Sequence, residues 1–148
     1  MATLQTIKKR LLSLKGNEGN IGLAALNSSS ENAADLIASQ LAQGIKSDGE
    51  KANFTYAPLT IAIKKTRQGL AAVTSHLTNF NTGESYNKLY FKASSGKVEF
   101  GTESDKEAAI SDRMDGKAFN LTPDNKKELL THVTFPIFRK KINEMIKL

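Results

Sequence analysis

Five carboxylates close together in the sequence are the residues best placed to do chemistry in this chain. They follow a run of alternating apolar and polar residues: Glu103, Asp105, Glu107, Asp112 and Asp115. Two carboxylates held near each other can act as a general acid and a general base. At these spacings on a predicted helix, however, we expect most of them to face solvent or to neutralise Lys106 and Arg113. We therefore predict that the protein is not an enzyme.

The other residue types that commonly form active sites are few and scattered. His76 falls in a predicted strand and His132 in a predicted helix, and the chain has no cysteine, so we expect no metal site and no disulfide. The glycines between Gly16 and Gly22 follow no predicted strand and lack the spacing of a phosphate-binding loop. The serines near the predicted hairpin lack the G-x-S-x-G setting of a hydrolase: Ser85, Ser94 and Ser95. We expect no cofactor.

Basic residues form two short clusters that could attract an anionic partner. The chain has 148 residues and a formal net charge of +6. An excess of basic residues suits nucleic acid, an anionic membrane or an acidic protein surface, and it also occurs on ordinary solvated surfaces. Neither cluster is interleaved with aromatic residues, so the indication of nucleic-acid binding is weak. The candidate DNA-contacting residues are Lys64, Lys65 and Arg67, and then Arg139, Lys140 and Lys141.

Apolar residues are spread along the chain without a run of about 18, so no membrane partner and no membrane-spanning helix is expected. The first 14 residues lack the continuous apolar segment of a secretory signal. The length allows one domain with a core, or one domain with an arm.

A predicted β-hairpin over about residues 86–102 is the element against which the helices are expected to pack. Apolar and polar residues alternate on both strands, as in strands with one buried face. Gly96 in the short connection can take the positive φ that a hairpin loop needs. The residues expected on the buried face are Leu89, Phe91, Val98 and Phe100.

The first 30 residues are predicted to form an arm. Four apolar residues at helical spacing predict an amphipathic helix over residues 3–15: Leu4, Ile7, Leu11 and Leu14. Gly16 ends this helix, and residues 17–30, rich in Gly, Asn and Ser, are predicted to be a linker. The apolar stripe either packs on its own domain or docks on a neighbouring subunit, so its four residues are the candidate docking residues. Residues 31–148 are then a single domain.

Signals for helix ends divide the rest of the chain into several helices and one further strand. Ser28 and Glu31 have the spacing of a capping box, and Gly44 ends the helix that follows. Alternation predicts a strand over residues 72–78, and Pro136 is expected to break or kink the last helical stretch. Further helices are predicted from Pro58 to Gly69, from Glu103 to Met114, from Thr122, and over residues 137–146. The predicted class is α+β: a short antiparallel sheet with a central hairpin, packed by helices, plus the N-terminal helical arm.

Several short blocks resemble one small protein of tailed phages and prophages of the Bacteroidota lineage. The blocks are Gln40-Leu41-x-x-Gly44-x-x-Ser47-Asp48-Gly49, Tyr56, the Lys64-Lys65 helix to Gly69, Thr82-Gly83-x-x-Tyr86 with the hairpin, and Gly116-x-x-x-x-Leu121-Thr122. This plan, over roughly residues 36–146, is similar to that of the head–tail connector and tail-completion proteins of phage necks. Phe100-Gly101-Thr102 stands where those proteins have a G-T-like step. Glu103 to Lys117 replaces the aromatic-rich and proline-rich stretch that often follows it.

The resemblance implies a structural role in the virion without a reaction, a cofactor or a metal. Many copies would form a ring below the portal, seal the DNA channel and present a docking surface to the tail. The implied partners are further copies of this chain, the portal, and other neck or tail proteins, with weak non-specific contact to DNA. The protein would be assembled in the cytoplasm of a bacterial host and work in the neck or tail region. The alternative is a basic nucleic-acid-binding accessory protein that uses residues 61–100 and 131–148.

Overall fold

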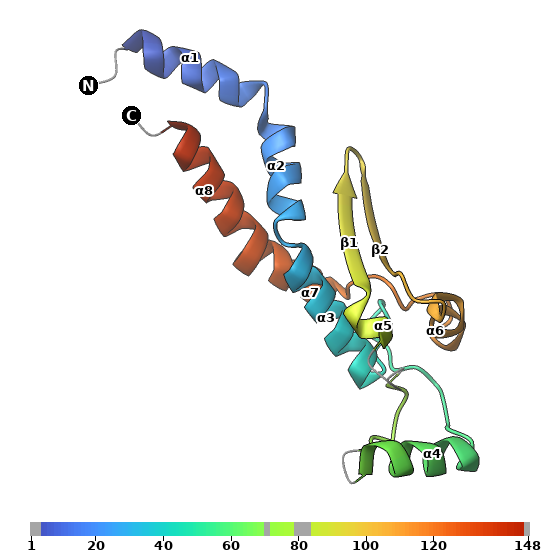
Figure 1. Cartoon of the computed structure of the whole chain (residues 1–148). Helices are drawn as coiled ribbons and strands as arrows, with labels where there is room; N and C mark the ends of the chain where they lie inside the picture. The colour runs from blue at the N-terminus through green and yellow to red at the C-terminus, as the bar shows by residue number, and fades with distance from the viewer. Residues whose placement is uncertain (1–3, 70–71, 79–83, 147–148) are drawn as a thin grey trace.

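A column of helices with a β-hairpin along one side makes up the molecule, so the expected α+β class is confirmed (Figure 1). The computed structural model describes residues 4–69, 72–78 and 84–146. Three successive helices run down the column: α1 (Leu4–Lys15), α2 (Glu18–Asn27) and α3 (Ser30–Gln43). The chain returns beside them in three joined segments: α7 (Pro123–Glu128), the π-helical turn η2 (Leu129–Thr134) and α8 (Phe135–Ile146).

The hairpin packs against α3 and α2 and confirms the central element of the prediction. Its two antiparallel strands are β1 (Leu89–Ser94) and β2 (Lys97–Thr102). Phe91 lies opposite Phe100, with 5.0 Å between the ring centroids in an edge-to-face arrangement. Gly96 in the turn has a φ of +79°, as expected. The first strand begins later than predicted, because residues 84–87 form the short helix α5 (Glu84–Asn87).

Three of the four residues expected on the buried face of the hairpin contact the core. Phe91 is buried, while Leu89 and Phe100 are partly buried against it. Val98 is 46% exposed, so this part of the prediction is wrong. Val98 pairs with Ala93 next to the turn, where the hairpin extends past α3 and the core no longer covers it (Figure 1).

The core lies where α3, the hairpin and the segments after it meet. Ile37 and Leu41 of α3 are fully buried, and so are Leu77 and Met114. Leu121, just before α7, is 1% exposed and joins the same cluster. Burying side chains of this size contributes about 1.5–3 kcal/mol each, so this cluster stabilises the contact between the two halves of the chain.

The predicted linker over residues 17–30 is wrong, because most of it is helical. α2 occupies its middle and buries Ile21 and Ala25. These two positions are four apart, so they lie on one helical face that packs toward α8 and β1. The Gly and Asn content of this stretch favoured a linker, although Ile21 and Ala25 have the spacing of a helical face.

The predicted capping box at Ser28 and Glu31 is also wrong. Ser28 Oγ donates to the carbonyl of Ala24, and Ser29 Oγ donates to the carbonyl of Ala25. Because α2 directly precedes these serines, their hydroxyls bond backward to α2, and α3 begins without a side-chain cap.

Two further boundaries differ from the predictions. Residues 72–78 are described and form no strand; they place Leu77 in the core instead. The helix predicted from Glu103 begins later, as α6 (Glu107–Arg113). The amide of Glu103 donates to the carbonyl of Lys88 at 3.0 Å, which prolongs the β-ladder by one residue and delays the helix.

The helix start at Thr122 is confirmed, whereas the break that was one expectation for Pro136 does not occur. Thr122 Oγ1 accepts a hydrogen bond from the amide of Asn125 at 3.2 Å, which caps α7. The chain stays helical through Pro136, but the turn before it is π-helical. Such a turn re-pairs the backbone where a proline lacks its N–H.

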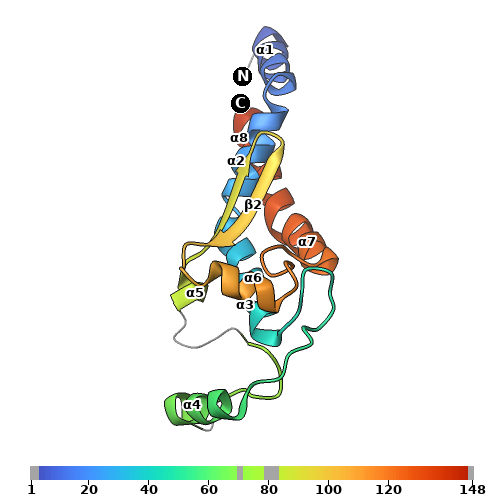
Figure 2. The ribbon, with the colours of Figure 1, turned by 90° about the vertical axis from the view of Figure 1, so that its right-hand side faces the viewer.

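α4 (Pro58–Gln68) stands apart from the column at the end opposite α1 (Figure 2). Its predicted limits are confirmed: Pro58 is the first residue, and Gly69 follows the last with a φ of +60°. Leu59 is 72% exposed and Ile63 is also exposed, so only one side of this helix faces the rest of the chain.

Gly44→Ala tests the packing at the end of α3. Gly44 has a φ of +66°, and an added Cβ would lie 2.5 Å from the carbonyl oxygen of Leu77. We expect a loss in the free energy of unfolding above the roughly 1–2 kcal/mol that a positive φ alone costs alanine. Urea denaturation measures it. Gly116→Ala is the matched control, because Gly116 has a φ of +74° and no atom near its Cβ position. Equal losses in both variants would show that the contact with Leu77 has no effect.

Candidate subunit-docking surface

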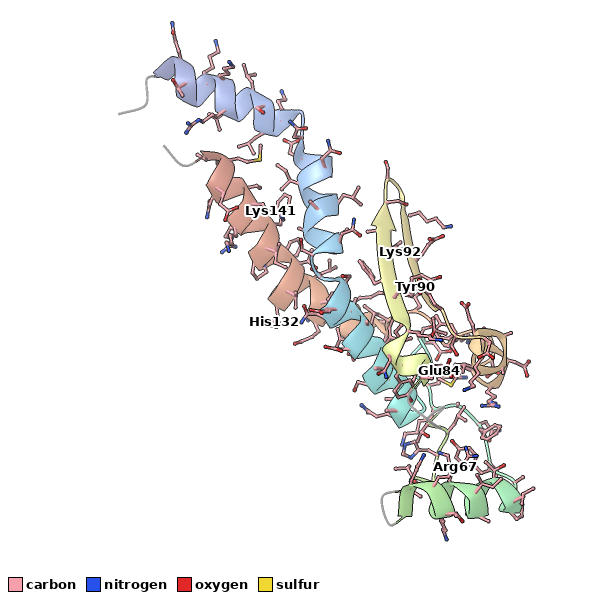
Figure 3. The ribbon with its side chains drawn as sticks, viewed as in Figure 1. Arg67, Glu84, Tyr90, Lys92, His132 and Lys141 are labelled. Atoms are coloured by element: carbon pink, nitrogen blue, oxygen red, sulfur yellow. The ribbon has the colours of Figure 1, made fainter. Side chains whose placement is uncertain are left out.

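The helices α1 and α8, called the α1/α8 pair below, meet at the end of the column away from α4 (Figure 3). Arg10 Nη1 donates to the carbonyl oxygen of Ile146 at 3.5 Å and so joins α1 to the last turn of α8. A cation there also suits the negative end of the helix dipole. Leu14 is buried near the end of α1. Two helices alone leave much of each other's surface in solvent.

Apolar side chains remain exposed on both members of the α1/α8 pair. Leu11 is 52% exposed and Leu12 is 61% exposed on α1. Met145 and Ile146 are exposed in the last turn of α8, and none of the residues from Phe135 to Ile146 is fully buried. Exposed apolar side chains gathered at one place and rimmed by polar residues are typical of a binding surface.

The positive charge of the protein is concentrated on the same two helices. They carry seven basic residues and one acidic residue, Glu144, which gives +6, the net charge of the whole chain. All other residues together therefore sum to zero. The basic residues are Lys8, Lys9, Arg10, Lys15, Arg139, Lys140 and Lys141. The exposed apolar side chains thus stand within a strongly basic region.

Two shallow grooves follow α8. One, of about 440 Å³, lies between α2 and α8, with Ile21, Ala24 and Met145 in its lining. The other, of about 480 Å³, lies along η2 and α8 beside Phe135 and Arg139. Both offer apolar surface beside charged groups, which suits side chains of a protein partner.

The structure places the four predicted docking residues on α1 but not on one free face. Leu11 is exposed and Leu14 is buried, so the end of the stripe packs within the chain. The backbone of Leu4 and Ile7 is helical, while their side chains lie outside what the structure describes. Leu14 thus packs within its own chain, and docking of the exposed Leu11 on a neighbouring subunit stays a prediction.

Sequence reasoning missed Leu12, Met145 and Ile146 as exposed apolar residues. Leu12 lies beside the apolar stripe of α1 and close to its basic residues. An apolar residue on the charged face of a helix could have indicated an exposed contact residue. Met145 and Ile146 belong to a helix whose amphipathic pattern was evident, but nothing in the pattern shows that α1 and α2 would leave the end of this helix partly uncovered.

The two predicted basic clusters lie at opposite ends of the molecule. Arg139 and Lys140 are exposed on α8, and Lys141 is half-buried there. Lys65 and Arg67 are exposed on α4, far from Lys141 (Figure 3). The clusters therefore form two separate basic regions and not one continuous nucleic-acid track.

Lys64, the remaining member of the α4 cluster, points inward and is only 6% exposed. Its Nζ donates to Thr78 Oγ1 at 2.8 Å, to the Tyr56 hydroxyl at 3.1 Å and to the carbonyl of Val73 at 3.1 Å. It also lies 4.3 Å from the centre of the Tyr56 ring, a cation–π contact. Because these three hydrogen bonds use all of its N–H groups, Lys64 holds α4 to the body and is not available to DNA.

The pKa values of the two tyrosines around Thr78 shift in opposite directions. Burial by itself raises the pKa of Tyr56, but hydrogen bonds with Thr78 and Lys64 outweigh burial and hold that pKa below its ordinary value. Burial raises the pKa of Tyr86, whose hydroxyl donates to the carbonyl of Thr78. Both phenols thus form hydrogen bonds that hold the chain around Thr78.

The carboxylates and histidines considered for chemistry do not converge in the described part of the chain. No group of three or more His, Asp or Glu side chains there could hold a metal ion. Asp115 accepts from Lys46 at 3.4 Å, and His132 lies 3.9 Å from Glu128 on the surface. Within the described residues, no helix has the length and apolar character needed to cross a bilayer.

Comparisons of the chain with protein-family models, with curated proteins and with solved structures gave no match.

Lys64→Met tests whether Lys64 is an anchor. Losing its hydrogen bonds should lower the free energy of unfolding by about 1–3 kcal/mol, because the carbonyl of Val73 loses its donor. Lys65→Met, one residue along on the exposed side, should change it by less than about 0.5 kcal/mol. Thermal unfolding followed by circular dichroism measures both variants. If Lys64→Met were as stable as Lys65→Met, the lysine would not hold α4.

Proposed function

We propose that the protein is a structural, non-enzymatic subunit of a phage neck or tail-completion ring. The likeness of its short motifs to head–tail connector proteins suggests the setting. The observation that most directly supports an assembly role is the group of exposed apolar side chains on the α1/α8 pair. In this proposal the α1/α8 pair docks on a neighbouring subunit of the ring.

The shape of the molecule supports such a role. The α1/α8 pair and α4 lie at opposite ends of the column, and both expose apolar side chains (Figure 2). A subunit with two separate contact regions can touch a different neighbour at each one. Contacts between unlike surfaces of identical copies build rings when the rotation closes.

The electrostatics limits what can dock on the α1/α8 pair. With +6 on each pair, two such pairs placed face to face would repel each other. The neighbour must therefore offer a neutral or acidic surface, such as a part of the same chain outside these helices. This favours contact between unlike surfaces.

Leu11→Ser combined with Leu12→Ser tests the docking surface. Both side chains are exposed, so the free energy of unfolding should change by no more than about 0.5 kcal/mol for each. Self-association should weaken because the apolar contact is lost, which sedimentation velocity over a concentration series measures. Leu130→Ser is the control, an exposed leucine on η2, between the two end regions. Unchanged association in the double variant, or the same loss with Leu130→Ser, would contradict docking through the α1/α8 pair.

Nucleic-acid binding is a second candidate function, and the concentration of charge on the α1/α8 pair favours it. Phosphate contacts carry no sequence information, so we expect weak, sequence-independent binding, with a dissociation constant no tighter than roughly 10⁻⁶ M at physiological salt.

Charge reversal on α8 tests this second candidate. Arg139→Glu with Lys140→Glu should weaken binding of a duplex and flatten its dependence on salt, as measured by fluorescence anisotropy. Lys65→Glu with Arg67→Glu, at the far end, should have a smaller effect because that cluster lacks the charge of α1. Nanomolar, sequence-selective binding that survives high salt would favour the accessory nucleic-acid-binding protein over the ring subunit.

A further inference from the structure

We propose that the outer edge of β2 pairs with β2 of a second copy of this chain, antiparallel and centred on Val98. The pairing would join two hairpins into a four-stranded sheet. It does not depend on the docking of the α1/α8 pair, because it uses a different surface.

The outer edge of β1 is closed by a side chain. Asn27, at the end of α2, donates from Nδ2 to the carbonyl of Ala93 at 2.9 Å, and its Oδ1 accepts from the amide of Ala93 at 2.9 Å. The carboxamide thus makes both hydrogen bonds that a neighbouring strand would make. A second strand cannot add at this position of β1.

The outer edge of β2 has no such cover. Ser94 and Lys97 flank the two-residue turn, so they form a hydrogen-bonded pair. Along the ladder from there, non-hydrogen-bonded and hydrogen-bonded pairs alternate. The bond from the Glu103 amide to Lys88 fits this alternation. The main-chain groups of Val98 and Phe100 therefore point outward, as those of Ala93 do on the other strand. Neither takes part in another hydrogen bond within the described residues.

An apolar groove of about 570 Å³ lies along this open edge. It runs between β2 and the segment that contains α7, and its lining includes Val98, Phe100, Phe119 and Leu129. Figure 1 shows the tip of the hairpin extending beside α2, and Figure 2 shows α7 beside the lower part of β2. Unpaired strand edges beside apolar surface are the usual acceptors of an added strand.

The charges of β2 make it complementary to itself. Lys97 and Glu99 lie on the same face of the strand and form an ion pair. In an antiparallel pair centred on Val98, Lys97 of each copy stands opposite Glu99 of the other, and Val98 stands opposite Val98. Opposite charges across strands stabilise the pair. The small residues Ser95 and Gly96 of one hairpin tip would then come near Phe100 of the other copy.

Other registers are disfavoured by the same residues. Centring on Glu99 would place two carboxylates opposite each other, and centring on Lys97 would do the same for two ammonium groups. Centring on Phe100 would require access to Thr102, which is 2% exposed and donates its hydroxyl to the carbonyl of Ser85. Val98 is the exposed centre that leaves both charge pairs favourable.

Two single charge reversals and their mixture test the pairing. Lys97→Glu places carboxylates at both positions 97 and 99, and Glu99→Lys places ammonium groups at both. Each variant alone should dimerise roughly tenfold or more weakly than the unmodified chain, because both cross-strand pairs become repulsive. An equimolar mixture should recover dimers, because in a dimer of one chain of each kind both cross-strand pairs join a carboxylate to an ammonium group. The repulsion between positions 97 and 99 within each chain stays the same, so it cannot explain the recovery. Sedimentation velocity and native mass spectrometry provide the readout, with one variant isotope-labelled because the two unlabelled variants have nearly the same mass.

A proline variant and a fixed background complete the experiment. Val98→Pro removes an outward N–H without touching the ladder to β1, so the hairpin should fold and dimerisation should be lost. All chains carry Leu11→Ser and Leu12→Ser, which separates this contact from docking by the α1/α8 pair. Circular dichroism confirms folding of each variant. A mixture that dimerises no better than either single variant, or a parent chain that stays monomeric throughout, would overturn the proposal.

Discussion

The carboxamide of Gln40 is the contact on which the arrangement of the two halves depends. It is 2% exposed, and its Nε2 donates to the carbonyl of Asn120 at 3.0 Å. Its Oε1 accepts from the amide of Thr122 at 3.0 Å and from Nδ2 of Asn125 at 2.6 Å. All these buried groups are paired, so α3 fixes the start of α7 without a desolvation penalty. A second contact of 3.0 Å between the hydroxyls of Ser29 and Thr134 aligns η2 further along. The direction of α8, and hence the place of the α1/α8 pair, follows from these two points.

The same logic explains why the molecule has two distinct ends. Between Gln40 and the hairpin the chain has a continuous core, but α8 beyond η2 packs mainly on α2 and α1. At the other end, α4 is held by a lysine that binds hydroxyl and carbonyl groups and by Ile61, which is partly buried against the core. Apolar side chains that neither end can bury are therefore left on the surface, where neighbouring molecules can cover them. An assembly role is the simplest use of such surfaces.

Local signals in the sequence predicted local structure well and long-range structure poorly. The turn at Gly96, the cap at Thr122 and the start of α4 at Pro58 each depend on residues within one turn of the chain. The linker prediction failed because α2 gains stability from packing on α8 and β1, which glycine content does not reveal. The inward direction of Lys64 depends on Tyr56 and Thr78, which meet it only in the folded chain. Exposure of Leu11 beside burial of Leu14 depends on where α8 ends.

Hydrogen exchange of the α1 and α8 amides tests the central claim, that the α1/α8 pair is covered on assembly. Exchange followed by mass spectrometry, at concentrations where sedimentation gives monomers and where it gives oligomers, would compare both states. In the monomer these helices have little tertiary cover, so their amides should exchange faster than those of α3. In the oligomer we expect slower exchange in α1 and the last turns of α8, with α3 unchanged. Equal protection of α1 and α8 in both states would contradict the account.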